Sequence, residues 1–173
     1  MAIFTGAGVA IITPFHEDGS INYDQLKKLV DYHCENGTDS IVICGTTGES
    51  ATMTEEEHLE CIKRTIDFTA GRLPVIAGTG SNCTATAVEL SREATKAGAD
   101  GLLVVTPYYN KTSQRGLIKH YTTVADAVDI PMILYNVPGR TGININVATV
   151  VELAKHKNIV AMKDATDNIA YAM

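Results

Sequence analysis

Six short apolar segments recur along the chain, and their starts lie roughly 30 residues apart, about the length of one βα unit. Turn-forming residues bound each segment, and an unbroken apolar run of this kind is typical of a strand buried on both faces of a parallel sheet. The expected strands cover residues 8–13, 40–44, 74–78, 101–106, 131–135 and 159–163. This spacing predicts an α/β fold with a parallel sheet.

The segments between the expected strands have the periodicity of helices. In each of three segments, a set of side chains shares one helix face. The three groups are Leu26, Leu29, Val30 and His33; Leu59, Ile62 and Ile66; and Leu117, Tyr121 and Val124. Thr54 and Glu57 form a capping box, and helices are expected to stop at Gly37, Gly71 and Gly98. Two architectures remain open, a doubly wound sheet and a (β/α)8 barrel. Because no linker interrupts the pattern, residues 1–173 are expected to form one domain.

The composition excludes several classes of protein. The 173 residues include 14 basic and 20 acidic side chains, so the formal net charge of −6 argues against nucleic-acid binding. No apolar run approaches the roughly 18 residues that span a bilayer, and the first residues lack the features of a signal peptide. The four cysteines form no CxxC pair, which is typical of reduced thiols in a cytoplasmic protein.

Polar residues gather where the expected strands end, which is where parallel folds bind their ligands. The segments that follow strands are GTTGES at 45–50, GTGSN at 78–82, PYYN at 107–110 and YNVPGRT at 135–141. The last expected strand ends on Lys163. Hydroxyls, tyrosines, an arginine and a lysine are therefore expected to meet at one end of the sheet.

Lys163 is the first candidate for chemistry. It follows four apolar residues, so its stem is expected to leave a dry strand. Burial disfavours the ammonium form and lowers the pKa of a lysine, which makes the amine nucleophilic and able to form an imine with a ketone. The alternative is a strand-end lysine whose stem extends to water.

The GTTGES segment is a candidate carboxylate site. Gly45 and Gly48 free backbone N–H groups, and Thr46 and Thr47 add two hydroxyls. The alternative is a plain βα turn. The segment is not a phosphate-binding Walker loop, and GTGSN fails the dinucleotide fingerprint because Cys83 replaces its third glycine. No nicotinamide cofactor is therefore expected, and no metal either, because the five histidines show no ligand spacing.

Tyrosines and an arginine complete the candidate set. The phenols of Tyr108, Tyr109 and Tyr135 could relay protons near an amine, although strand-end tyrosines are often core residues with one wet tip. Arg140 follows Pro-Gly on a stiff loop, where its guanidinium could clamp a carboxylate in two-point fashion. The alternative for Arg140 is a solvated loop residue.

The order GTTGES, TPYYN, YNVPGRT and VAMKDAT resembles the dihydrodipicolinate synthase family over almost the whole chain. The resemblance implies a (β/α)8 TIM barrel and a class I aldolase-type lyase that needs no cofactor. The implied lyase reaction condenses pyruvate with aspartate 4-semialdehyde to 4-hydroxy-tetrahydrodipicolinate, for lysine and diaminopimelate biosynthesis. It also implies a cytoplasmic homo-oligomer, a tight dimer that pairs into a homotetramer.

The resemblance also implies a role for each candidate residue. Lys163 forms the Schiff base, Thr46 and Thr47 hold the pyruvate carboxylate, and Arg140 binds the carboxylate of the semialdehyde. Tyr135 transfers protons and is linked through Thr47 to Tyr109, which reaches across the dimer interface. Asp164 stands where the family usually has glutamate, and this change is expected to matter little.

Two alternatives to this function are kept. Sister aldolases that act on keto-sugar acids, such as sialate lyases, share the lysine and the tyrosine. The chain is also about two βα units short of the eight in a closed barrel, which typically has about 250 residues. We therefore expect strands 1 to 6 of a longer enzyme, and an inactive half-barrel fragment is the non-enzymatic alternative.

Overall fold

The computed structural model describes residues 3–173. Their contacts divide the chain into two compact units, one with residues up to 78 and residues 93–101, the other with residues 79–92 and 102–173. The expectation of a single domain stays a prediction. Among residues 3–173, no helix is both long enough and apolar enough to cross a lipid bilayer.

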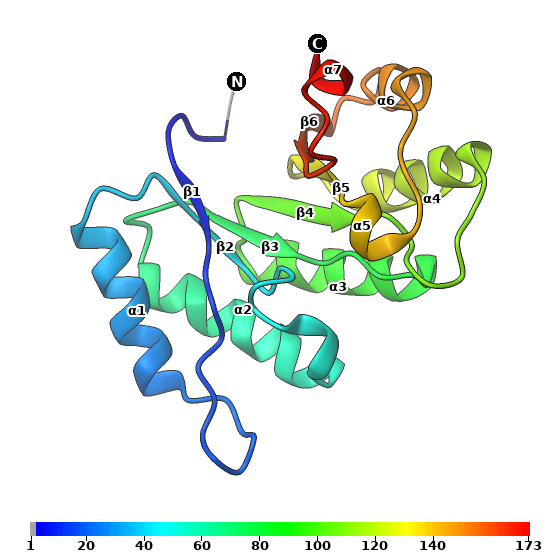
Figure 1. The fold of residues 1–173 in the computed structure, drawn as a ribbon. Coiled ribbons are helices and arrows are strands. Elements are labelled where there is room, and N and C mark those ends of the chain that lie inside the picture. Colours follow the sequence, from blue (N-terminus) through cyan, green and yellow to red (C-terminus); the bar gives the residue numbers. More distant parts are fainter. Residues whose placement is uncertain (1–2) are drawn as a thin grey trace. The chain divides into compact units, whose positions relative to one another are not determined.

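The first unit is a parallel sheet with two long helices packed against each other (Figure 1). Its elements are β1 (Gly8–Ala10), α1 (Tyr23–Glu35), β2 (Ser40–Ile43), η1 (Ser50–Thr52), α2 (Glu55–Thr69) and β3 (Val75–Gly78). β2 pairs in parallel with β1 and with β3. The helices connect successive parallel strands, which is the βα repeat predicted from the spacing of apolar runs.

Local signals in the sequence set the ends of these helices. The Asn22 side chain accepts a hydrogen bond from the N–H of Gln25 and caps α1. The predicted capping box of Thr54 and Glu57 is confirmed at the start of α2. Beyond the helix ends, Gly37 and Gly71 have φ of +78° and +73°, a conformation that glycine adopts without steric cost.

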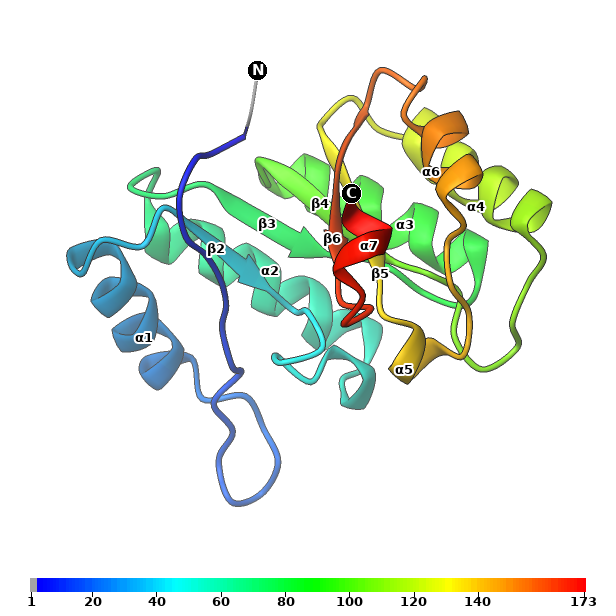
Figure 2. The ribbon, with the colours of Figure 1, turned by 45° about the horizontal axis from the view of Figure 1, so that its top comes forward.

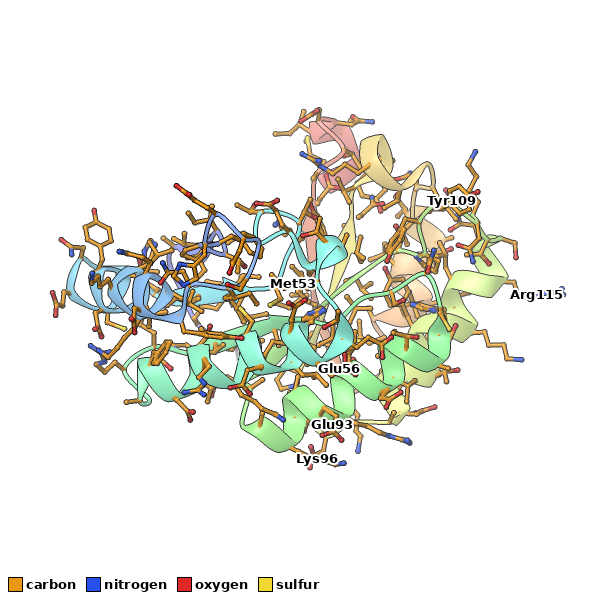
Figure 3. The ribbon with its side chains drawn as sticks, turned by 90° about the horizontal axis from the view of Figure 1, so that it is seen from below. Met53, Glu56, Glu93, Lys96, Tyr109 and Arg115 are labelled. Carbon is orange, nitrogen blue, oxygen red and sulfur yellow. The ribbon has the colours of Figure 1, made fainter. Side chains whose placement is uncertain are left out.

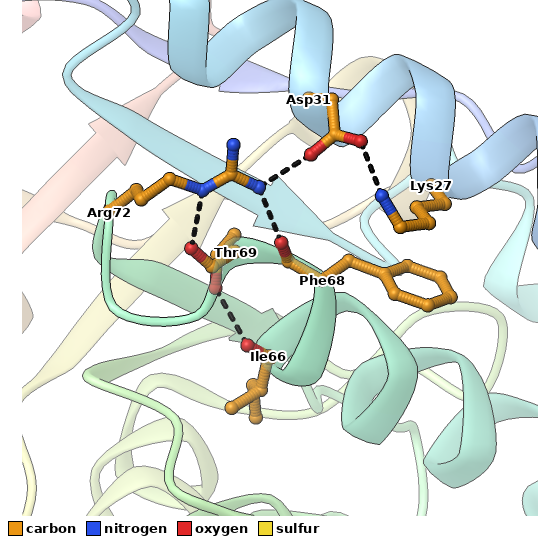
Figure 4. A network of polar contacts seen from close by, with 6 residues as sticks. All are labelled: Lys27, Asp31, Ile66, Phe68, Thr69 and Arg72. Atoms are coloured by element: carbon orange, nitrogen blue, oxygen red, sulfur yellow. Dashed lines mark hydrogen bonds and ion pairs between the residues drawn. The ribbon is translucent and has the colours of Figure 1, made fainter.

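Arg72 joins the end of α2 to α1 (Figure 4). Its guanidinium donates to the carbonyls of Phe68 and Thr69 at 2.6 and 3.0 Å, and to the carboxylate of Asp31 at 2.5 Å. It thereby satisfies carbonyls that the helix end leaves without a partner. Lys27 binds the other oxygen of Asp31, and the two cations hold the pKa of that carboxyl below its ordinary value.

The second unit contains three further strands in parallel register (Figure 2). Its elements are β4 (Gly101–Val105), α4 (Gln114–Asp126), β5 (Met132–Asn136), α5 (Pro138–Thr141), α6 (Val147–Leu153), β6 (Ile159–Asp164) and α7 (Ile169–Ala172). The helix before them, α3 (Thr84–Ala97), has residues in both units. β5 pairs with β4 and with β6, and α4 packs against α6.

The expected burial of the strands is right for some and wrong for others. β2 and β3 are buried throughout and β4 nearly so, as predicted from their unbroken apolar runs. The expectation is wrong for β1 and β6, whose residues are largely half-buried or exposed. In the described part of the chain, β1 pairs only with β2 and β6 only with β5, so each has one uncovered edge.

His120 on α4 is a buried polar residue in the second unit. Its Nδ1 forms a hydrogen bond of 2.9 Å with the hydroxyl of Thr84, whereas its Nε2 has no partner among the described residues. The neighbouring Tyr121 ring is buried, meets His120 edge-on and donates its hydroxyl to Val104 O. Burial disfavours the imidazolium and lowers the pKa of His120 to about 4.

This burial predicts an acid-sensitive fold. Between pH 6.5 and 4 the unfolded chain binds a proton at His120 that the folded chain does not, so stability is full above pH 6.5 and falls as the pH is lowered. The loss should reach about 3 kcal/mol at pH 4. Denaturant unfolding at several pH values should show that His120→Gln, which cannot titrate, loses about 3 kcal/mol less than the wild type over this range.

A Thr84→Val variant is the matched control, because it removes the hydrogen-bond partner of His120 but keeps the buried, titrating ring. It should therefore keep the steep pH dependence of the wild type. Parallel stability curves for the wild type and His120→Gln would contradict the prediction.

Candidate functional site

Lys163 and Tyr135 lie opposite each other on paired strands. Tyr135 of β5 is in register with Lys163 of β6, and the Lys163 Nζ lies 4.5 Å from the centroid of the Tyr135 ring. This distance is within the range of a cation–π contact. The tyrosine is buried, but the lysine side chain is exposed. The expectation that Lys163 has a buried stem is therefore wrong, because β6 has only one neighbouring strand among residues 3–173.

A β-bulge produces this register. Met132 pairs with Ile159, but the next residue, Ile133, pairs with Ala161, so Val160 is an extra residue in β6. Without the shift, Tyr135 would stand opposite Met162. The bulge therefore places the amine of Lys163 beside the phenol ring, and bulges are known to re-aim side chains in this way.

The next pair of residues, Asn136 and Asp164, forms a polar network beside this contact. The Asn136 amide donates to Asn144 Oδ1 at 2.8 Å and to Asp164 Oδ1 at 3.3 Å, and it accepts from the N–H of Ile145 at 3.1 Å. The other oxygen of Asp164 accepts from the Thr166 hydroxyl at 2.7 Å. Sequence reasoning missed Asn136, although its position directly after Tyr135 was a signal.

Arg140 lies on α5, the short helix that follows β5. Pro138 occupies the first position of this helix, and the Thr141 hydroxyl donates to the carbonyls of Val137 and Ile143 at 3.1 and 3.0 Å. These hydrogen bonds lie within the loop, and its stiffness stays a prediction from the Pro-Gly sequence. The Arg140 side chain is exposed, and no carboxylate among residues 3–173 pairs with it. Its guanidinium is free to bind an anionic group.

Tyr108 and Tyr109 lie on the loop between β4 and α4. Figure 3 shows Tyr109. Tyr109 is 90% exposed and has a φ of +68°, which is uncommon for a residue with a side chain. Within the described residues no hydrogen bond joins Tyr109 to Tyr135. The proton relay through Tyr109 therefore stays a prediction.

The GTTGES segment in the first unit has the geometry of an anion-binding loop. Cys44 adopts a φ of +55°, and the segment turns on a hydrogen bond of 3.1 Å from the N–H of Gly48 to Gly45 O. The Thr13 hydroxyl holds it by donating to Gly48 O at 2.7 Å. Thr46 and Thr47 are exposed, and no described group accepts a hydrogen bond from either backbone N–H. Two N–H groups and two hydroxyls are thus available to a small carboxylate.

His58 of α2 and Gly78 of β3 support this loop. A methyl group at Gly78 would lie 2.3 Å from Cys44 O, so only glycine allows this close approach. The His58 Nε2 donates to Gly78 O at 2.7 Å, and burial lowers the pKa of this histidine. Sequence reasoning did not single out His58 or Thr13 as supports, because their partners are backbone carbonyls distant in sequence.

The structure brings together part of the predicted set. Lys163 and Tyr135 are in contact, and Arg140 lies on a loop that begins one residue after Asn136. Thr46 and Thr47 belong to the other compact unit, so their grouping with Lys163 stays a prediction. Within the described part of the chain, no three or more His, Cys, Asp or Glu side chains are arranged to hold a metal ion.

Two curated proteins of similar sequence are called 4-hydroxy-tetrahydrodipicolinate synthase. The chain is 61% identical to 4-hydroxy-tetrahydrodipicolinate synthase from Lachnoclostridium phytofermentans and 58% identical to the enzyme of that name from Geobacter sulfurreducens. Each alignment covers 98% of this chain and 58% of the relative. The chain therefore spans a little over half of the length of these curated relatives.

Solved structures give the same result. Dihydrodipicolinate synthase from Aquifex aeolicus has a TM-score of 0.95 at 53% identity, over 97% of this chain and 57% of that one. The chloride-inhibited enzyme from Acinetobacter baumannii, complexed with pyruvate, has a TM-score of 0.96 at 50% identity, over 98% of this chain and 58% of that one.

These likenesses confirm the predicted fold class, a (β/α)8 barrel of which about six βα units are present. The family model described as the Dihydrodipicolinate synthetase family matches residues 3–173. With strand-end motifs, fold and relatives in agreement, the chain belongs to the dihydrodipicolinate synthetase family.

Proposed function

We propose that this protein is a Schiff-base lyase that condenses pyruvate with aspartate 4-semialdehyde to 4-hydroxy-tetrahydrodipicolinate, in lysine and diaminopimelate biosynthesis. The observation that carries the proposal is the contact between the Lys163 amine and the Tyr135 ring at the ends of two paired strands. The names of the relatives and the pyruvate in the Acinetobacter baumannii structure support the choice of reaction and substrate.

The first half of the reaction activates pyruvate. The Lys163 amine attacks the ketone carbon, and loss of water gives an imine. The protonated imine withdraws electrons, so that the adjacent methyl group loses a proton and becomes a carbon nucleophile. Tyr135, whose ring lies against the amine, is the group that moves these protons. By resemblance to the family, Thr47 links the Tyr135 hydroxyl to Tyr109.

The second half joins the two substrates. The enamine attacks the aldehyde carbon of the semialdehyde, and cyclisation with release from Lys163 gives the heterocyclic product. Thr46 and Thr47 hold the pyruvate carboxylate through their unpaired N–H groups and hydroxyls. Arg140 binds the carboxylate of the semialdehyde. The imine itself supplies the electron sink, so the chemistry requires no cofactor.

The proposal includes the assembly and the compartment. A tyrosine that is 90% exposed on a strained loop supports a tight homodimer, since burial of Tyr109 against a second copy would remove its ring from water. Two such dimers would form a homotetramer. The four cysteines are free, which supports a reducing compartment, the cytoplasm.

Trapping with borohydride tests the role of Lys163. Treatment of the purified protein with pyruvate and sodium borohydride should add one reduced pyruvate to Lys163, as seen by peptide mass spectrometry. Lys163→Arg keeps the charge but cannot form the imine, so it should gain no adduct. Lys155→Arg, which changes an exposed lysine on another segment, should gain the adduct normally. An unmodified wild-type Lys163 would overturn the proposal.

Arg140→Ala tests the second substrate. Loss of the two-point clamp should raise the KM for aspartate 4-semialdehyde about tenfold or more and leave the KM for pyruvate nearly unchanged. Arg115→Ala, at an exposed arginine of α4 (Figure 3), should behave like the wild type. An unchanged semialdehyde KM in Arg140→Ala, together with turnover of keto-sugar acids by the wild type, would favour the sister aldolase.

Thr46→Val tests the carboxylate site. The substitution keeps the shape of the side chain but removes its hydroxyl, so the KM for pyruvate should rise about tenfold. Thr46→Ser, which keeps the hydroxyl, should remain within about threefold of the wild type. Equal pyruvate KM values for Thr46→Val and the wild type would show that this hydroxyl does not bind the carboxylate.

A further inference from the structure

Asn136 is fully buried, yet its side-chain amide has three polar partners. Its relative exposure is 0%, and it bonds to Asn144 Oδ1, Asp164 Oδ1 and the N–H of Ile145. A buried amide that lost these partners would retain the cost of its desolvation. The network therefore fixes the positions of the groups around Asn136 and not only that of Asn136 itself.

The partners of Asn136 lie at the far end of the loop that it begins. Residues 137–144 leave β5 directly after Asn136 and return to it, because Asn144 and Ile145 both bond to its side chain. Arg140 lies in the middle of this loop. One side chain on the strand thus closes a loop that carries the free guanidinium.

The other bonds of the loop play different parts. The bonds from the Thr141 hydroxyl and from the N–H of Gly142 lie inside the loop, so they fix its shape but not its direction from the strand. Gln114 binds the carbonyl of Asn144 at 2.8 Å and anchors it to α4. The Asn136 side chain links the far end of the loop to β5, the strand that carries Tyr135.

Asn136 also touches β6 beside the lysine. It stands in register with Asp164, the residue after Lys163, and donates to its carboxylate at 3.3 Å. Its single amide is therefore bonded to the Arg140 loop and to the strand that carries Lys163. The two groups proposed to act on different substrates share this buried anchor.

We infer that Asn136 is a positioning residue that clasps the 137–144 loop and sets Arg140 at a fixed place relative to Lys163 and Tyr135, and so governs recognition of the second, carboxylate-bearing substrate. The inference rests on the proposed function. Backbone pairing of β5 with β6 holds Lys163 opposite Tyr135 without help from the Asn136 side chain. Loss of the clasp therefore affects the semialdehyde far more than the pyruvate.

The half-buried partner Asn144 offers the sharpest test. Its side-chain oxygen accepts from Asn136, and its side-chain nitrogen has no partner among the described residues. Asn144→Ala removes the acceptor, whereas Asn144→Asp keeps one. Asn136→Ala removes the whole clasp, although its buried site makes it more damaging to folding. Asn158→Ala, which removes two hydrogen bonds elsewhere in the same unit, controls for general destabilisation.

The kinetic readout is the separation of two Michaelis constants. Asn144→Ala and Asn136→Ala should raise the KM for aspartate 4-semialdehyde about tenfold or more, with the pyruvate KM within about twofold of the wild type. Asn144→Asp should restore the semialdehyde KM, and Asn158→Ala should change neither constant. An unchanged semialdehyde KM in Asn144→Ala, or an equal rise in both constants, would overturn the inference.

A second readout does not depend on activity. Trypsin cleaves after exposed arginines, and a loop released from its clasp opens more often. The rate of cleavage after Arg140 should rise in Asn144→Ala but not in Asn144→Asp, and cleavage after Arg115 serves as the internal reference. Equal rates of cleavage after Arg140 in Asn144→Ala and in the wild type would contradict the proposed role of Asn136 in holding the loop. If the wild type forms no pyruvate adduct while the clasp behaves as expected, the proposed function fails and the structural role of Asn136 stands.

Discussion

The register between β5 and β6 is the constraint on which the candidate site depends. Side chains alternate between the two faces of a strand, so a one-residue slip would send Lys163 to the wrong face. The bulge at Val160 introduces such a shift between Met132 and Ile133, and every pair beyond it follows the new register. Tyr135 then meets Lys163, and Asn136 meets Asp164. A local irregularity in one strand thus assigns the roles of four residues.

The two pairs created by this register have opposite characters. Lys163 is exposed, whereas Asn136 is fully buried and its side-chain amide forms three hydrogen bonds. A reactive group must be reached by substrate, but the groups around it must be held within a fraction of an ångström. The hydrogen bonds of Asn136 supply that rigidity, while the Lys163 amine lies beside the Tyr135 ring.

Much of this arrangement could be predicted from the sequence. Apolar runs located all six strands, Thr54 and Glu57 located the start of α2, and the strand ends indicated Lys163, Tyr135 and Arg140. The apolar run before Lys163 predicted a buried stem, because such a run by itself does not reveal whether a strand has one neighbour or two. The role of Asn136 was also hidden, since its partners are eight or more residues away and a bulge in the neighbouring strand decides which of them it meets.

All the lysines of residues 3–173 are exposed, so burial does not distinguish Lys163 from the others, but its contact with the Tyr135 ring does. Lys27, Lys96 and Lys155 are exposed and each forms an ion pair with a carboxylate three or four residues away. Such a partner would compete with a ketone for the amine, because it stabilises the ammonium form. The acidic residue nearest to Lys163 in sequence is Asp164, and its carboxylate is bonded to Asn136 and Thr166. The network that clasps the Arg140 loop thus also occupies the carboxylate of Asp164, and the Lys163 amine faces an aromatic ring.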